Sequence, residues 1–228
     1  MKIERLSLIS GARRAKGSAV IIDVFRAFTT AAYVMANGAR FIIPVGSLEE
    51  AFELKRLHPE WVLIGEREGR RVEGFDYGNS PWEVSDVDFT GRAVIQTTGA
   101  GTQGIVNASG ADEIILGSFV TAGAIVKHLR GSRPEIISLV AMGDVGVRPN
   151  AEDELCASYI EASLAGKRTD FEEMRERIRR AQSGAKFFDP SLPQFREGDY
   201  HLALELDRFD FILKVDRSNG HRIEVCQP

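Results

Sequence analysis

Cysteine is scarce in this 228-residue sequence, which contains only Cys156 and Cys226. These two residues lie far apart in the chain, so the sequence does not predict a disulfide framework. The four histidines show no metal-ligand spacing, which disfavours a zinc site. A secretory leader and a membrane-length apolar run are also missing. We therefore expect a cytoplasmic protein with no membrane partner.

An excess of basic residues is missing as well. Lys and Arg total 29 against 33 Asp and Glu, which gives a net charge of −4. Because broad nucleic-acid binding usually requires a basic face, we expect no nucleic-acid partner, although a local arginine cluster can still bind a small anion. The length predicts one α/β domain over residues 1–228, with residues 166–228 as a candidate C-terminal lobe. A homo-oligomer is compatible with this composition.

Three familiar phosphate and nucleotide motifs are absent. The glycine-containing stretch Thr97–Thr102 lacks the Gly-Lys-Ser/Thr ending of a Walker-type loop. It also lacks the full dinucleotide fingerprint, so no nicotinamide cofactor is expected. Phe25 replaces the second aspartate of the Asp-x-Asp-x-Thr pattern found in haloacid-dehalogenase phosphatases. This replacement disfavours a covalent aspartyl-phosphate route by that mechanism.

The sequence does contain a repeated alternation of strand-like and helix-like segments up to about residue 165. This pattern usually produces buried parallel strands with helices on both faces. The predicted fold class is therefore α/β, a three-layer α/β/α arrangement with a mostly parallel, mixed central sheet. Two late segments, 211–215 and 222–225, are predicted to form an antiparallel edge. The earlier strands are predicted at 18–22, 41–45, 61–64, 93–96, 113–117 and 135–142.

Four short polar clusters are the most informative feature of the chain, and three of them follow predicted strands. In an open α/β sheet the carboxyl ends of the strands gather into one crevice, where ligands bind. We therefore expect carboxylates, arginines, hydroxyls and glycines to converge there, a mixture that suits a metal ion and an oxyanion. The clusters are Asp23–Thr30, Gly65–Arg67, Gly74–Pro81 and Thr97–Thr102.

Several carboxylates are candidate ligands for a hard cation. Asp23, Glu66 and Asp76 are predicted to be catalytic and to bind Mg²⁺, which prefers oxygen ligands. Glu152 and Asp153, at the start of a predicted helix, are further candidate metal ligands. Structural alternatives stay open. Asp23 can cap a helix, Asp76 can bond within its own turn, and the acidic pair can favour the helix dipole.

Other side chains in the clusters are candidates for binding the substrate. Arginine can grip an oxyanion in bidentate fashion, and the glycines of the fourth cluster let the backbone approach one. The alternatives are an Arg26–Asp23 surface pair, helix caps and structural turns. The predicted substrate-binding residues are Arg26, Thr29, Thr30, Arg67, Asn79, Ser80, Thr97, Thr98, Gly101 and Thr102.

Taken together, the clusters resemble the 2-phosphosulfolactate phosphatase family. The resemblance implies a three-layer α/β/α fold around a mixed sheet. It also implies a Mg²⁺-dependent phosphatase that releases phosphate and 3-sulfolactate, a step toward coenzyme M. At the fourth cluster the family often reads Thr-Thr-Asn-Gly-Thr, whereas Thr97–Thr102 is one residue longer and has no Asn. The matching stretches are Val20–Thr30, Asn37–Ala39, Gly65–Arg67, Glu73–Pro81, Gly117–Phe119 and Glu152–Ala157.

The resulting hypothesis is a Mg²⁺-dependent phosphatase that hydrolyses 2-phospho-3-sulfolactate to 3-sulfolactate and phosphate. Its partner would be a small phosphorylated organic acid. Two alternatives remain: a hydrolase of another small phosphorylated acid, and a non-catalytic protein that binds a small anion. Which carboxylate is a metal ligand and which is a general base is left open by the sequence.

Overall fold

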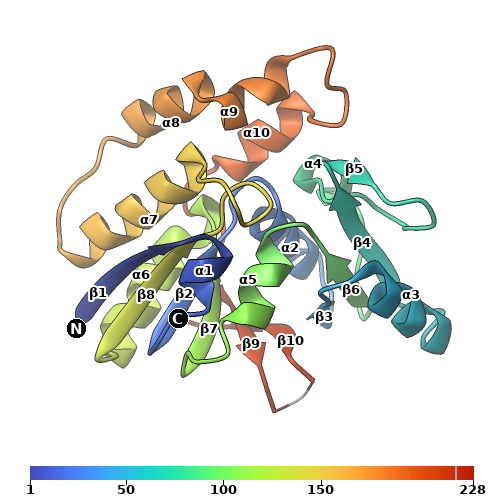
Figure 1. The fold of residues 1–228 in the computed structure, drawn as a ribbon, viewed down its shortest axis with the longest axis horizontal. Coiled ribbons are helices and arrows are strands. Elements are labelled where there is room, and N and C mark those ends of the chain that lie inside the picture. The colour runs from blue at the N-terminus through green and yellow to red at the C-terminus, as the bar shows by residue number, and fades with distance from the viewer. Residues whose placement is uncertain (219) are drawn as a thin grey trace.

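The computed structural model describes residues 1–218 and 220–228 of the chain. Over these residues ten strands form one sheet, in the order β1-β8-β2-β7-β9-β10-β3-β6-β4-β5 (Figure 1). The strands are β1 (Lys2–Ser7), β2 (Ser18–Ile22), β3 (Phe41–Pro44), β4 (Val62–Arg67), β5 (Arg70–Arg71), β6 (Ala93–Thr97), β7 (Glu113–Gly117), β8 (Ile136–Ala141), β9 (Ile212–Asp216) and β10 (Arg222–Cys226).

The helices lie between and around these strands, and two of them are short 3₁₀ helices. They are α1 (Leu8–Ala12), α2 (Ala27–Ala36), α3 (Leu48–Leu57), α4 (Pro81–Val84), α5 (Gly101–Asn107), η1 (Phe119–Thr121), α6 (Ala122–Ser132), α7 (Ala151–Leu164), α8 (Phe171–Arg180), α9 (Gln182–Ala185), η2 (Lys186–Phe188) and α10 (Glu197–Ala203). In the part of the chain that the structure describes, no helix combines the length and apolar character needed to cross a bilayer.

Two groups of parallel strands make up most of the sheet. β1, β8, β2 and β7 pair in parallel, and so do β3, β6 and β4. The antiparallel hairpin β9–β10 joins the two groups, since β9 pairs with β7 and β10 pairs with β3. The prediction of an α/β fold with a mostly parallel, mixed sheet is therefore confirmed.

The predicted position of the two late strands is wrong, although their antiparallel pairing is correct. The β9–β10 hairpin lies inside the sheet rather than at its edge. The reason is burial on both faces: Leu213 belongs to one hydrophobic core and the adjacent Ile212 to another. A strand whose neighbouring side chains are buried on opposite faces needs cover on both sides, which a central position supplies.

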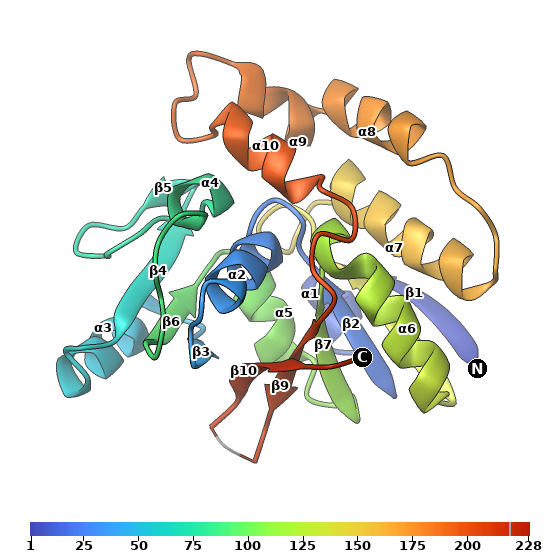
Figure 2. The same cartoon turned by 180° about the vertical axis from the view of Figure 1, so that it is seen from behind.

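The alternation of side chains along β2 explains how the sheet holds helices on both faces. Ile21 packs in a core with residues of α1, α2 and α5. Val20 and Ile22 point the other way, into a core with residues of α6 and α7. Successive strand residues point to opposite faces, so this all-apolar strand is buried on both. Figure 2 shows α6 on the face opposite to α5.

No prediction covers β1 and α1, because Lys2–Ser7 mixes charged and apolar residues. The structure places β1 at the edge of the sheet beside β8, where its residues are only partly buried. The second difference concerns β4, which continues to Arg67 rather than ending before Gly65. Glu66 and Arg67 are therefore held by strand geometry and not by a surface turn.

The C-terminal helices cover one end of the sheet. Figures 1 and 2 both show α8, α9 and α10 lying together across the end toward which α7 and α4 project. Helix α10 packs against α4, and α8 and α9 pack against α7. The candidate lobe 166–228 thus gives two strands to the central sheet and three helices to its cover.

Candidate active site

A pocket of about 620 Å³ opens where several strands end, beneath the C-terminal helices. It draws on the loops after β2, β4, β6 and β8 and on the segment after α9. Its lining is formed by Asp23, Phe25, Arg26, Glu66, Arg67, Glu68, Gly69, Asn79, Thr98, Gly99, Ala100, Gly143, Asp144, Val145, Arg148, Asn150, Lys186 and Phe195. The predicted convergence of the polar clusters is thus visible for part of each cluster.

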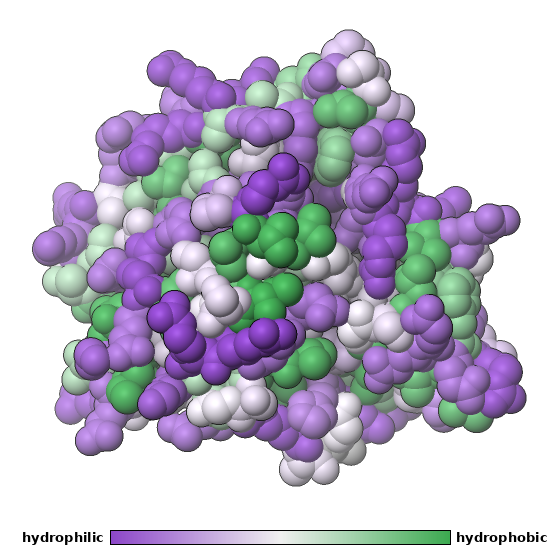
Figure 3. All heavy atoms as spheres, viewed as in Figure 1, coloured by the Kyte–Doolittle hydropathy of each residue, from purple (hydrophilic) through white to green (hydrophobic). Residues whose placement is uncertain are grey.

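A second pocket, of about 520 Å³, adjoins the first. The two share Asp144, Arg148, Asn150, Lys186 and Phe195, so together they form one two-part cleft. Figure 3 shows the face seen in Figure 1, which is mostly hydrophilic with apolar residues gathered near its centre. The loop between β8 and α7 contributes exposed apolar side chains, Val145 at 55% and Val147 at 63% exposure. The entrance therefore combines apolar and charged groups.

Asp23 is buried at the carboxyl end of β2, with 4% of its surface exposed. Its Oδ1 accepts a hydrogen bond from the Ala27 amide at 3.1 Å, and the Gly101 amide also bonds the carboxyl group. The pKa of Asp23 is raised to about 7, chiefly by burial and in part by the negative charges of Glu66 and Glu152, against the lowering effect of the two amide bonds. This carboxyl group therefore changes its protonation near neutral pH.

Gly101 is required at this point for steric reasons. A Cβ atom there would lie 2.7 Å from the Ala27 Cβ and 2.9 Å from Asp23 Oδ2. Such contacts are too short for any side chain, so glycine lets the start of α5 approach the carboxylate. Gly101 was predicted to bind the substrate. In the structure its amide bonds the carboxyl group of Asp23 instead.

Glu66 is the second carboxylate of the pocket, and backbone amides hold both of its oxygens. Oε1 accepts from Gly99 at 2.9 Å, and Oε2 accepts from Gly69 at 2.7 Å. The loop after β6 thus contacts both carboxylates, Glu66 through Gly99 and Asp23 through Gly101. These two amides, predicted to bind a substrate anion, instead orient the protein's own acids.

The threonines of the fourth cluster stabilise that loop. Thr98 donates its amide to Thr102 Oγ1 at 3.1 Å, and the Thr102 amide donates to Thr98 Oγ1 at 3.3 Å. Of these two, only Thr98 lines the pocket. Thr97 is fully buried, and its Oγ1 accepts from Arg67 Nη2 at 3.1 Å. Thr98 and Thr102, both predicted to bind substrate, therefore stabilise the loop after β6. Thr97, the third such threonine, holds the side chain of Arg67.

Arg67 and Arg26 both line the pocket, but their bonding differs. Arg67 bonds only its own neighbourhood, donating to the Glu66 carbonyl at 2.6 Å and to Thr97. Arg26 is buried and forms an ion pair at 2.7 Å between its Nη1 and Oδ2 of the fully buried Asp199. Arg26 also donates to the backbone carbonyls of Gln194 and Gly69, at 3.0 and 2.8 Å. Arg26 thus links the pocket to the C-terminal segment, and the surface pair with Asp23 is not formed.

The remaining predicted substrate-binding residues divide into two groups. Asn79 lines the pocket, and its buried Oδ1 has no hydrogen-bond partner among the described residues. Ser80 caps α4 and donates to Asp199 Oδ1 at 2.5 Å. Thr29 and Thr30 are completely buried in α2, away from the pocket lining, and the Thr29 hydroxyl donates to the Val24 carbonyl. Of these four, Asn79 alone faces the cleft.

Asp76 was predicted to be catalytic and to bind the metal. In the structure it does not line the pocket. Its Oδ2 accepts from the Leu63 amide at 2.8 Å and pairs with Lys55 Nζ at 3.3 Å. The residue is exposed, whereas the adjacent Phe75 is buried. In the structure Asp76 therefore holds its turn against β4, and its carboxylate bonds a distant strand rather than the backbone of its own turn.

Asp153 and Glu152 are buried at the start of α7, and neither lines the pocket. Asp153 accepts from the Val24 amide through Oδ1 and from the Gly143 amide through Oδ2, both at 2.8 Å. It thereby joins the loop of Asp23 to the loop after β8. Burial raises the pKa of Asp153 well above its ordinary value, and the charges of Glu152 and Asp23 add to this.

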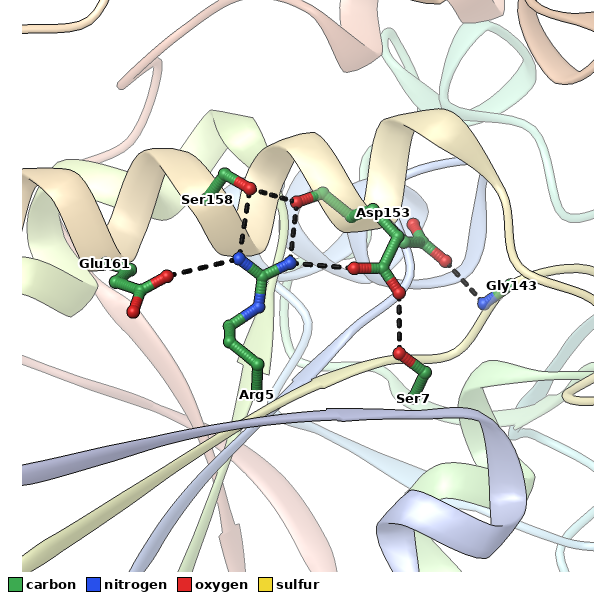
Figure 4. Close-up of polar contacts among 7 residues, drawn as sticks. Arg5, Ser7, Gly143, Asp153, Ser158 and Glu161 are labelled. Atoms are coloured by element: carbon green, nitrogen blue, oxygen red, sulfur yellow. Dashed lines mark hydrogen bonds and ion pairs between the residues drawn. The ribbon is translucent and has the colours of Figure 1, made fainter.

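Helix α7 also contacts β1: Figure 4 shows Arg5 of β1 pointing toward Ser158 and Glu161 of the helix, and Asp153 beside Gly143. Glu154 accepts from Ser7 at 2.6 Å and from Arg5 at 2.7 Å, which ties the start of α7 to β1. Arg5 also donates to Ser158 at 3.0 Å, one turn further along the helix. Glu152, which receives the Ser183 hydroxyl, leaves its Oε1 without a partner among the described residues. Helix α7 is thus fixed on both sides beneath the cleft.

Sequence reasoning missed the residues that the C-terminal segment and the β8–α7 loop bring to the site. Lys186 lines both pockets, and burial together with the positive charge of Arg26 lowers its pKa, while the charges of Glu152, Asp144 and Asp23 oppose this. Asp199 was missed because its partners, Arg26 and Ser80, are more than a hundred positions away. The stretch 185–196 reads as irregular and proline-bearing, and no motif marks it.

The donor set of the pocket fits a hard cation. Asp23, Glu66 and the unpartnered Oδ1 of Asn79 are all oxygen ligands, which Mg²⁺ prefers. Across residues 1–218 and 220–228, no group of three or more His, Cys, Asp or Glu is placed to hold a metal by itself. Mg²⁺ usually relies on one or two carboxylates, with waters and substrate phosphates as the other ligands.

Fold and pocket together define an α/β protein with a polar pocket at the strand ends, in which carboxylates such as Asp23 and Glu66 lie beside arginine side chains. The model of the 2-phosphosulpholactate phosphatase family matches residues 5–212 of the chain. The chain therefore belongs to this family, as its motifs predicted, and the family places it among the phosphoric monoester hydrolases.

Individual relatives agree with the family assignment. A probable 2-phosphosulfolactate phosphatase from Bacillus subtilis is 32% identical over 200 residues, which cover 86% of each chain. One from Thermotoga maritima is 38% identical over 184 residues, 74% of this chain and 77% of the relative. One from Caldicellulosiruptor saccharolyticus is 41% identical over 145 residues, 62% of this chain and 60% of the relative.

Proposed function

We propose that this protein hydrolyses 2-phospho-3-sulfolactate to 3-sulfolactate and phosphate with Mg²⁺ as cofactor. The observation that carries the proposal is the pair Asp23 and Glu66, aligned by amides of one loop beside Arg67. The names of the relatives, each a probable 2-phosphosulfolactate phosphatase, support the substrate. The reaction would then serve coenzyme M biosynthesis in the cytoplasm.

The residues that would hold Mg²⁺ are Asp23 and Glu66, with Asn79 Oδ1 as a further oxygen ligand. When bound, this cation neutralises charge on a phosphoryl group and lowers the pKa of a bound water. The other predicted ligands, Asp76, Glu152 and Asp153, do not line the pocket. Their place outside the lining leaves Asp23 and Glu66 as the predicted carboxylate ligands that face the pocket.

The side chains of the pocket suit the remaining steps of phosphate ester hydrolysis. Arg67 lies with its guanidinium between β4 and β6, where it can bind phosphoryl oxygens through its unused donors. Of Asp23 and Glu66, the carboxylate that leaves an oxygen free of the cation can accept a proton from an attacking water. The apolar ring of Phe25 and the C-terminal cover limit the access of bulk water.

The direct test is phosphate release from a substrate panel. It would contain 2-phospho-3-sulfolactate, phosphoglycolate and p-nitrophenyl phosphate, each with Mg²⁺ and after EDTA treatment. We expect the highest kcat/KM for 2-phospho-3-sulfolactate and loss of turnover in EDTA, restored by Mg²⁺. Full activity of a chelator-treated sample would refute the Mg²⁺ requirement.

The same panel separates the alternatives. A higher kcat/KM for another phosphorylated acid would identify a different phosphatase. No turnover of any ester, together with calorimetric binding of 3-sulfolactate, would identify a binding protein. Melting temperature with and without Mg²⁺ gives a readout of cation binding that needs no turnover, because a ligand of the folded state stabilises it.

A further inference from the structure

Lys186 lies where the two parts of the cleft meet, and its positive charge has no task in the steps given above. The larger pocket contains Asp23 and Glu66, whereas the second contains Ser183. Lys186 and Arg148 line both. A group bound by these two cations would therefore lie to one side of the carboxylates, toward the second pocket.

The ammonium group of Lys186 has no hydrogen-bond or ion-pair partner among the described residues. Its close contacts are instead the ring of Phe195, 4.4 Å from Nζ to the centroid, and the ring of Phe187 at 5.5 Å. Aromatic faces attract a cation, but they do not replace the hydrogen bonds that water would give it. A partly buried ammonium with donors that no protein group accepts can bind an anionic ligand.

The carboxyl groups nearest to Lys186 are engaged with other residues. Glu152 receives the Ser183 hydroxyl, and Asp144 pairs with Arg148. These carboxylates attract Lys186 through space without bonding its Nζ. The local negative charge keeps the lysine in the cleft while leaving its three donors available.

Arg148 can take part in the same binding event. Its Nη2 pairs with Asp144 Oδ2 at 2.6 Å, but 75% of the arginine side chain is exposed. Exposed ion pairs of this kind contribute little to stability, so the guanidinium can exchange its partner for a substrate group. An ammonium and a guanidinium that line the same pocket are the usual composition of an oxyanion subsite.

We propose that Lys186 and Arg148 form a second anion subsite, which binds an acidic group of the substrate other than its phosphate. That group is a sulfonate or a carboxylate. The inference rests on the proposed function and deepens it, because it makes the C-terminal segment the part that selects phosphate esters with a further acidic group. Arg67, Asp23 and Glu66 would remain with the phosphate.

Calorimetric binding of two product anions tests the subsite without requiring turnover. The probes are inorganic phosphate, which fits only the phosphate site, and 3-sulfolactate, which carries the further acidic groups. We expect Lys186→Met to weaken 3-sulfolactate binding at least tenfold, corresponding to about 1.4 kcal/mol, and to change phosphate binding by less than twofold. Arg148→Gln should show the same pattern with a smaller loss, and Lys186→Arg should keep most of the affinity.

The matched control is Lys127→Met, which removes an exposed lysine of α6 far from both pockets. It should bind both probes as the wild type does. Lactate and 2-hydroxyethanesulfonate, which offer a carboxylate or a sulfonate alone, identify the group that Lys186 holds. The probe that loses affinity in Lys186→Met carries that group.

Several outcomes would overturn the inference. Equal losses for phosphate and 3-sulfolactate would place Lys186 at the phosphate, and unchanged affinities would remove it from the site. Absence of 3-sulfolactate binding to the wild type would also overturn it. Kinetics then separate the subsite from the proposed function. Phosphate release that is insensitive to Lys186→Met would contradict the subsite alone. No phosphate release from any ester would contradict the proposed function.

Discussion

The strand-end loops and the C-terminal segment contribute to one pocket in different ways. The strand ends and loops between residues 22 and 102 bring Asp23, Glu66 and Arg67, each fixed largely by bonds to nearby backbone or to a neighbouring strand. The segment 166–228 brings Asp199 and Lys186 across from its helices. Figure 1 shows this cover, in orange, spanning the end of the sheet. The polar side chains of the pocket are thus held by residues close to them in sequence or on a neighbouring strand. The cover over the pocket comes from a distant part of the chain.

This difference leads to distinct expectations for variants of the two regions. Altering a carboxylate of the loops should reduce the rate of reaction and leave the fold intact or even more stable. Altering the buried ion pair of the cover should reduce the free energy of unfolding.

The largest effect is expected for Asp23→Asn. The amide side chain resembles the protonated carboxyl group in shape but can neither bind Mg²⁺ as an anion nor accept a proton. A general acid or base contributes about 10²–10⁴ in rate, so we expect kcat to fall about 1000-fold or more. Phosphate release by the purified, folded variant measures this. A rate within tenfold of wild type would reduce Asp23 to the helix cap that the sequence also allowed.

The same variant should alter stability in the opposite direction. Burial raises the pKa of Asp23 from its ordinary value near 4 to about 7, so the folded protein binds the extra proton between these pH values. Stability contributed by this group is present below pH 4 and falls as the pH rises through 7. Relative to wild type, Asp23→Asn should gain up to about 3 kcal/mol in free energy of unfolding between pH 5 and 8.

Urea unfolding in EDTA at both pH values measures that gain. Glu152 and Asp153 titrate in both proteins, so the difference between the proteins chiefly reports Asp23. Adding Mg²⁺ at pH 8 should stabilise the wild type and not the variant. A pH-independent difference would show that Asp23 is ionised in the folded protein throughout this range.

The second prediction concerns the ion pair between the two regions. Asp199→Asn leaves the buried Arg26 without its counter-charge, and removal of one partner of a buried pair costs about 3–5 kcal/mol. We expect the free energy of unfolding to fall by that amount in urea denaturation. The control is Glu172→Gln, which breaks the exposed pair with Arg175 and should cost less than about 1 kcal/mol. Similar small losses for both would make the cover independent of this pair.

The strand-end region could be predicted from the sequence, and the contribution of the C-terminal segment could not. The strand at 18–22, its terminal Asp23 and the glycine loop were readable because apolar runs and glycines act locally. The position of the β9–β10 hairpin was not, since an apolar strand near the C-terminus has no signal for which neighbours it will join. Asp199 and Lys186 were missed for a related reason: their roles depend on tertiary contacts with residues far away in sequence.

Asp76 shows the converse error. Its cluster is rich in oxygen ligands and resembles a site, but composition does not tell which way a side chain points. In the structure its carboxylate accepts from the amide of Leu63 in β4, thirteen positions earlier in the chain. Asn79, three positions later, faces the pocket instead. One residue of the cluster thus lines the pocket, and the direction in which each side chain points came only from the fold.

The third prediction compares the two arginines. Arg67→Lys keeps the charge and removes the planar fork, so we expect kcat/KM to fall about 10–100-fold. The free energy of unfolding should change by less than about 1 kcal/mol, since the bonds that Arg67 makes within the protein lie in its own strand region.

Arg26→Lys should lower both activity and stability, because it also disturbs the bonds to Gln194 and Gly69. Steady-state kinetics and urea unfolding of the two variants give the contrast. Equal stability losses would mean that Arg67 is as structural as Arg26, and would leave phosphate binding to other groups.

The smallest effect is expected for Asp76→Asn. The asparagine Oδ1 can still accept from the Leu63 amide, and only the half-exposed pair with Lys55 is lost, which contributes about 0–1 kcal/mol. We expect kcat/KM within about twofold of wild type and a melting temperature lowered by a few degrees at most. Asp23→Asn in the same assay supplies the scale. A fall of 100-fold or more in Asp76→Asn would return this residue to the catalytic set and require the turn after β4 to reorganise when substrate binds.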